Sequence, residues 1–152
     1  MRSASFLFVA GAFAIAILLG WLAATLNAAG WAPLGLLPFV VGAILGVLIM
    51  RLAGALQNIG QWPLMIAVVG FAIVTVATEH AWLYRDFRRQ WYETRAANAQ
   101  VALFRPESPW SPIEYVAREF TPTHAMLWSA DAVIIIVSAV IVPYIARRPI
   151  AN

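Results

Sequence analysis

Four long apolar runs, separated by short polar or proline-containing breaks, dominate the chain. The first, about 5–27, contains no charged residue. At 1.5 Å per residue it is long enough to cross roughly 30 Å of hydrocarbon. The others cover about 34–56, 63–84 and 124–146. We therefore predict four transmembrane helices.

The third run is expected to continue as a helix beyond the membrane. It is followed by RDFRRQWYETRAA, residues 85–97, and no glycine or proline interrupts this stretch before Pro106. Without a helix breaker, the pattern predicts that the helix extends to about residue 97.

A short helix is predicted between the third and fourth runs, at about 111–120. Ser111 is a suitable N-cap, Pro112 fits the first helical position, and Glu114 completes a capping box. Because apolar residues recur on one face of this segment, we expect it to lie on the membrane surface.

The fourth run contains VIIIVSAVIV, residues 133–142, which in water would suggest a buried strand. In lipid a lone strand would leave its backbone unsatisfied, so we expect a helix. The predicted fold is thus all-α: one integral membrane domain over residues 1–152, a bundle of four transmembrane helices with an extended third helix and a short interfacial helix.

Composition supports this fold. Hydrophobic residues make up 62% of the chain and charged residues 11%, against roughly 45–50% and 25% in soluble domains. All ten basic residues are arginines near the ends of apolar runs, where they reach lipid headgroups, so no nucleic-acid surface is expected. The absence of cysteine excludes disulfides and thiolate metal sites. Arg2 and the first run also fit a signal peptide, but the length of the run favours an uncleaved span.

Four spans place both termini on the same side of the membrane. Counting arginines slightly favours the long loop as cytoplasmic. We nevertheless predict cytoplasmic termini, because Arg2 precedes the first helix, Arg147 and Arg148 end the last, and acidic residues are interspersed among the arginines of the loop.

Glu79, His80 and Asp131 are the candidate intramembrane polar site. Counted from the helix ends, they lie at roughly the same depth, 6–10 Å below one surface, so they could meet. Such a cluster could relay protons or hold a small ligand such as a quinone, with Trp82 and Trp128 at its edge. The alternative is structural: the acids bond to hydroxyls at Thr75, Thr78 or Ser129, or to Arg85, and hold two helices in register.

The two histidines, His80 and His124, raise the possibility of bis-histidine haem b ligation. Both lie near the loop side of consecutive spans. A haem needs both imidazoles in one cavity at the same level, whereas His124 sits at the membrane boundary. We therefore expect no cofactor.

Gly42 and Gly46 form a G-x-x-x-G step in the second run. Such steps let helices approach closely. We expect packing within this chain, with the first helix and its Gly11 and Gly20 as a possible partner, although a helix of another protein is the alternative.

Aromatic residues and arginines gather where the third helix leaves the membrane. An aromatic belt with arginines reaching headgroups explains them. They could also form a docking surface for a partner subunit or anionic lipid. The candidate residues are Arg85, Arg88, Trp91, Tyr92 and Arg95.

No phosphate-binding loop, zinc-type histidine spacing or nucleophile elbow is present. The short loops and sparse intramembrane polarity favour a non-catalytic accessory or scaffold subunit of a larger membrane complex. Two alternatives remain: a proton-coupled carrier or channel using Glu79 and Asp131, and an electron-transfer subunit binding haem b or quinone near His80 and His124.

Overall fold

The computed structural model describes most of the chain as five helices and their flanking turns. The described residues are 2–30, 35–56, 61–97, 109–119 and 121–146. The helices are α1 (Arg2–Ala28), α2 (Leu36–Leu56), α3 (Gln61–Ala97), α5 (Pro112–Glu119) and α6 (Pro122–Ala146). Within the described ranges there is no strand.

The predicted fold class is confirmed. Four helices, α1, α2, α3 and α6, are long and apolar enough to cross a membrane. The 37 residues of α3 make it the longest, and at 1.5 Å per residue it measures about 55 Å, well beyond the roughly 30 Å of a hydrocarbon core. The expected extension of the third helix is therefore present.

Local sequence explains where these helices begin and end. At the end of α1 the N–H of Gly30 bonds to the Asn27 carbonyl at 3.0 Å, and Gly30 has a φ of 76°. This left-handed conformation is the usual helix C-cap of glycine. The predicted capping box of α5 is confirmed, because the Ser111 N–H donates to the Glu114 carboxylate at 2.8 Å and the Glu114 N–H donates to the Ser111 hydroxyl at 3.2 Å.

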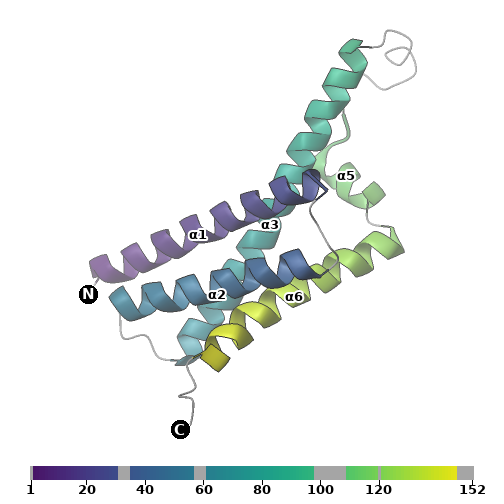
Figure 1. The fold of residues 1–152 in the computed structure, drawn as a ribbon. Helices are drawn as coiled ribbons and strands as arrows, with labels where there is room; N and C mark the ends of the chain where they lie inside the picture. Colours follow the sequence, from purple (N-terminus) through teal and green to yellow (C-terminus); the bar gives the residue numbers. More distant parts are fainter. Residues whose placement is uncertain (1, 31–34, 57–60, 98–108, 120, 147–152) are drawn as a thin grey trace.

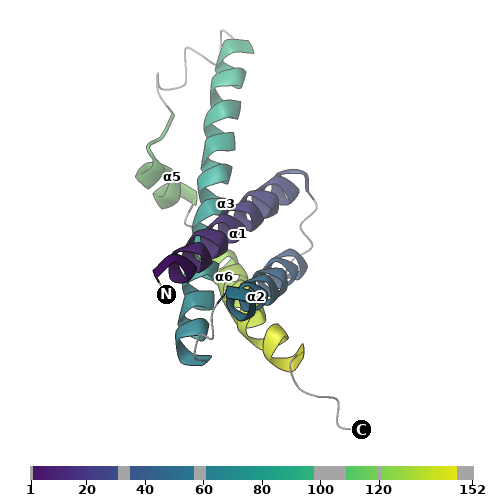
Figure 2. The same cartoon turned by 90° about the vertical axis from the view of Figure 1, so that its left-hand side faces the viewer.

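The four long helices alternate in direction, and the most extensive contacts join helices that run the same way. α2 packs mainly on α6, and α1 mainly on α3, with smaller contacts between α1 and α2 and between α3 and α6. Figures 1 and 2 show α3 continuing past the other long helices, with α5 beside it. The start of α1 and the end of α6 lie at the opposite end of the bundle (Figure 1). We call the end with α5 the loop side.

The core is built from small and aliphatic side chains. Ala12, Ala16, Leu45, Ile49 and Ile135 are almost completely buried. Large apolar side chains such as Phe6 and Ile66, each 72% exposed, lie on the outer surface. In water such a surface would be unstable, whereas lipid solvates it. Small apolar side chains inside and large apolar side chains outside are the distribution expected for a helical bundle surrounded by lipid.

The α2–α6 contact brings two backbones together. A Cβ added at Gly46 would lie 2.7 Å from the Ala139 carbonyl carbon, and one at Gly42 would lie 2.8 Å from the Ile135 Cα. Only glycine allows this approach. Pro143 has no N–H to offer the Ala139 carbonyl one turn earlier, and Gly46 packs against this same carbonyl. The glycine pair therefore contacts α6 within the chain, whereas the sequence had suggested α1.

Outside the bundle, α5 is attached to α3 by aromatic side chains. The ring of Tyr115 lies 5.2 Å from that of Tyr84 and 4.9 Å from that of Phe87, and Trp110 stacks on Phe87 at 5.4 Å. The Tyr84 hydroxyl also donates to the Trp110 carbonyl at 2.9 Å. These contacts explain how a helix of eight residues, too short to be stable alone in water, has a defined place.

Candidate functional site

A small group of polar side chains from α1, α3 and α6 lies near the loop-side end of the bundle. Glu79 of α3 is half-buried, forms a side-chain hydrogen bond with Asn27 of α1, and is close enough to Asp131 of α6 for the two carboxyl groups to interact electrostatically. Asn27 is the penultimate residue of α1. Asn27 and Glu79 therefore meet near the loop-side end of the bundle, with the Asp131 carboxyl within electrostatic range of Glu79.

His80 lies next to this pair but packs on an aromatic ring. Its imidazole centroid is 4.3 Å from the ring of Trp128 in α6, at an interplanar angle of 45°. His124 belongs to α6, but its side chain lies outside the described residues. A shared haem pocket of His80 and His124 therefore stays a prediction, and the described geometry of His80 is that of a ring packed between two helices.

The hydroxyl partners predicted for the acids donate instead to their own helix. The Thr75 hydroxyl donates to the Phe71 carbonyl at 3.0 Å, and the Thr78 hydroxyl donates to the Val74 carbonyl at 2.8 Å. Such bonds satisfy a buried hydroxyl locally. Arg85 also points elsewhere, since its guanidinium lies 4.2 Å from the centroid of the Trp82 ring.

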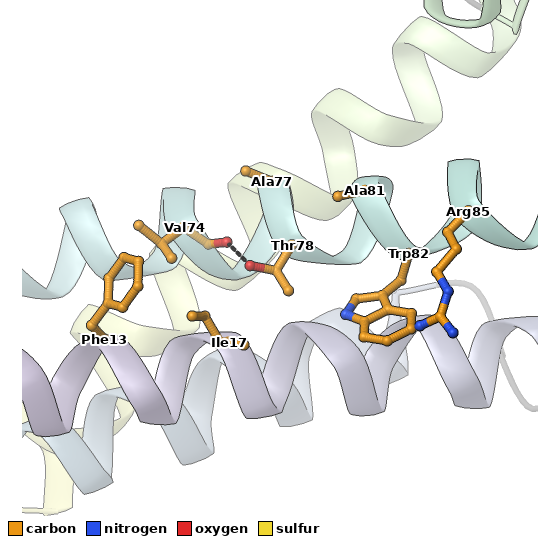
Figure 3. A pocket seen from close by; sticks show the side chains of 8 residues that line it. All are labelled: Phe13, Ile17, Val74, Ala77, Thr78, Ala81, Trp82 and Arg85. Carbon is orange, nitrogen blue, oxygen red and sulfur yellow. Dashed lines mark hydrogen bonds between the residues drawn. The ribbon is translucent and has the colours of Figure 1, made fainter. Parts of the chain in front are cut away.

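Trp82 and Trp128 have different described neighbours. Trp128 contacts His80 at the α3–α6 junction. Trp82 instead lines an open groove between α1 and α3 together with Arg85 (Figure 3). The two tryptophans that were predicted to lie together at the edge of the polar site are thus on different sides of α3.

The acid pair, with Asn27, can hold a proton or attract a small cation. An amide N–H donor stabilises an ionised carboxylate, whereas a second negative charge nearby destabilises it. Among the described residues, no group of three or more histidines or acids is placed to hold a metal ion. The described cluster thus consists of one hydrogen bond between α1 and α3 and a carboxyl group of α6 in electrostatic range.

The residues predicted to dock a partner have different environments along the extension of α3. Trp91 is buried, with 7% of its surface exposed, and its ring is covered in part by Tyr92 at 5.3 Å and by the Arg95 guanidinium at 5.4 Å. Arg88 is exposed, and Tyr92 is 47% exposed. Arg88 and Tyr92 are therefore accessible from outside, whereas Trp91 is covered.

Sequence reasoning missed Asn27 and the groove. Thr25 and Asn27 are the polar side chains near the loop-side end of α1. The depth of Asn27, compared with that of Glu79, could have indicated that the two side chains meet. The groove depends on how α1 and α3 are rotated against each other, which no local pattern reports. Comparison of this chain with known protein families, with curated proteins and with solved structures finds no match.

Proposed function

We propose that this chain is a non-catalytic accessory or scaffold subunit of a larger membrane assembly. The observation that supports this proposal is the ordered structure at the loop side. It consists of residues 85–97 of α3, Trp110 and α5, and we call it the loop-side platform. A long helix continues outside the bundle and a second helix is attached to it by aromatic rings and a hydrogen bond.

The platform is ordered and carries exposed side chains of the kinds found in interfaces. Ile113 is 81% exposed, Val116 and Tyr92 are each 47% exposed, and Arg88 is exposed. Arginine and aromatic residues are enriched where proteins bind one another. Because the platform is already ordered, a partner that binds it loses less conformational entropy than with a disordered loop.

The chemistry of this surface favours a particular partner. Residues 85–97 contain four arginines and two acids, and α5 adds Arg118, Glu114 and Glu119, so the platform has an excess of one positive charge. Ile113 and Val116 of α5 add an apolar patch beside them. We therefore infer that the partner is another membrane subunit with an acidic segment next to its own span, since complementary charges select partners and orient them.

A pull-down with a matched control tests this proposal. The tagged chain is purified from its native membrane in a mild detergent, as wild type, as Arg88→Gln/Ile113→Ser, and as Arg51→Gln. Arg51 is exposed on α2, toward the other end of the bundle. We expect one stoichiometric membrane partner with the wild type and Arg51→Gln, and its loss with the double variant. Migration of the wild type as a lone monomer, or retention of the partner by the double variant, would overturn the proposal.

A second candidate is a proton-coupled carrier or channel, and the electrostatic interaction between the Glu79 and Asp131 carboxyl groups favours it. An acid pair that exchanges protons at a membrane surface is the minimal element of such a device. The test is proton flux into liposomes containing the purified chain, read with an enclosed pH-sensitive dye. Equal flux for wild type, Glu79→Gln and Asp131→Asn would exclude this function.

We also propose that both termini face the cytoplasm. Arg2 before the first span and Arg147 and Arg148 after the last support this orientation. A C-terminal reporter that is active only in the cytoplasm tests it. Activity of a matched reporter that works only outside the cytoplasm would show the reverse orientation.

A further inference from the structure

An open groove runs along the outer side of the α1–α3 contact. Its volume is about 520 Å³, within the roughly 300–1,000 Å³ of small-molecule sites. α1 contributes two lining residues and α3 six, and none of the eight is acidic (Figure 3). The lining residues are Phe13, Ile17, Val74, Ala77, Thr78, Ala81, Trp82 and Arg85.

The groove is apolar along most of its length and cationic at one end. Phe13, Ile17, Val74 and the alanines offer hydrocarbon surface, and the hydroxyl of Thr78 is already bonded to the Val74 carbonyl at 2.8 Å. At the loop-side end the Arg85 guanidinium lies 4.2 Å from the centre of the Trp82 ring, and both side chains point toward α1 (Figure 3). The lining thus changes from apolar to cationic toward the membrane boundary.

The length of the groove matches one leaflet of a bilayer. Val74 and Arg85 are eleven residues apart on one helix, which corresponds to about 16 Å along its axis. The hydrocarbon core is about 30 Å thick, so a single leaflet contributes about half of this. A lipid with its acyl chain beside Phe13 and Val74 would place its phosphate at the level of Arg85.

We propose that this groove binds one anionic phospholipid of the loop-side leaflet. Its acyl chain occupies the groove between α1 and α3, and Arg85 binds its phosphate. A guanidinium presents a planar fork of N–H donors that matches phosphate oxygens. Stacking on Trp82 holds the guanidinium in place, which lowers the entropy lost when the headgroup binds. This inference does not depend on the proposed role as a subunit.

The test uses the full chain purified in detergent and mixed with equal amounts of phosphatidylglycerol and phosphatidylcholine that carry the same acyl chains. Native mass spectrometry counts each bound lipid. We expect one lipid to bind per chain, with about five times as much bound phosphatidylglycerol as bound phosphatidylcholine. This is the preference for an anionic lipid that one arginine at a membrane surface confers. Added inorganic phosphate should not displace it, because the acyl chain contributes most of the contact.

Three variants separate the parts of the site. Arg85→Gln should bind both lipids equally, whereas Arg88→Gln, one turn along the same helix and outside the groove lining, should keep the preference. Ala77→Phe should fill the groove and reduce binding of both lipids. Circular dichroism checks that each variant folds.

The inference would be overturned by an unchanged preference in Arg85→Gln, by full lipid binding in Ala77→Phe, or by displacement with inorganic phosphate alone. Co-purification of a quinone or of a partner helix in the groove, in place of lipid, would also overturn it.

Discussion

The two pairs of parallel helices in this bundle pack differently. In α2–α6, Gly42 and Gly46 stand one turn apart and bring the backbone close to that of α6 at Ile135 and Ala139. In α1–α3 a single glycine, Gly20, approaches the other backbone, where an added Cβ would lie 2.8 Å from the Thr78 Cβ. Towards the other end of that pair, Phe13 and Ile17 border the groove.

This difference shows how few residues separate a closed helix contact from an open one. Two glycines one turn apart on the same helix face let the two backbones approach closely along that face. A single glycine allows close approach at one crossing point only, and larger side chains on either side of it keep the helices apart. The open pair has a groove with an arginine at its end. Four predictions test this comparison and the stability of the loop side.

The largest effect is expected for Gly46→Ala in the closed pair. The added methyl would overlap the Ala139 backbone, which cannot move aside as a flexible side chain could. We expect a loss of about 2–3 kcal/mol in the free energy of unfolding, the upper part of the range for overpacking. Reversible unfolding in mixed micelles measures it.

The control for this substitution is Gly70→Ala in α3, because nothing lies within 4 Å of a Cβ at that position. It should be neutral or stabilise the protein by up to about 1 kcal/mol through helix propensity. Equal stability of Gly46→Ala and Gly70→Ala would contradict a close α2–α6 contact.

A smaller loss is expected for Gly20→Ala in the open pair. The new methyl meets the Thr75 carbonyl and the Thr78 Cβ, but the groove leaves α1 space to tilt. The cost should be about 1 kcal/mol, the lower end of overpacking effects, and it should be accompanied by weaker lipid binding. A cost as large as that of Gly46→Ala would show that the two pairs are equally tight.

Outside the bundle, Tyr84→Phe should loosen the attachment of α5. It removes the 2.9 Å hydrogen bond to the Trp110 carbonyl while keeping the ring contacts. The free energy of local opening of α5 should fall by about 0.5–1.5 kcal/mol, as measured by amide hydrogen exchange. Tyr92→Phe, whose ring packs on Trp91, is the matched control and should leave exchange in α5 unchanged.

The smallest effect is a pH dependence at the start of α5. The Ser111 backbone N–H and hydroxyl lower the pKa of the Glu114 carboxyl, with help from the charge of Arg118. Because this pKa is lower in the folded state, its stabilising effect is complete above the ordinary value of about 4.3 and is lost as the pH falls through the folded value.

Backbone chemical shifts of α5 recorded from pH 7 to pH 3 measure this loss. Glu114→Gln should remove the dependence, because an amide does not titrate in this range. A transition of the same size in Glu114→Gln would assign the pH effect to another group.

Much of the architecture was accessible from the sequence. The spans, the extension of α3 and the capping box of α5 all follow from local rules, since lipid requires helices and Ser111 and Glu114 lie three residues apart. The depth estimate predicted Glu79, His80 and Asp131 at one level, and the Glu79 and Asp131 carboxyl groups are close enough to interact electrostatically. The hydrogen bond between Glu79 and Asn27 depends on how α1 and α3 pack against each other, which no local pattern reports.

Which segments are helices, and roughly where each begins and ends, could be read from local patterns, because backbone hydrogen bonding and solvent preference act within a few residues. Three features follow instead from the packing of whole helices: Gly46 contacts α6, Trp82 and Trp128 lie on different sides of α3, and α1 and α3 leave a groove that ends at Arg85. These outcomes depend on the rotation and spacing of whole helices. That choice is set by the summed fit of many small contacts between distant segments.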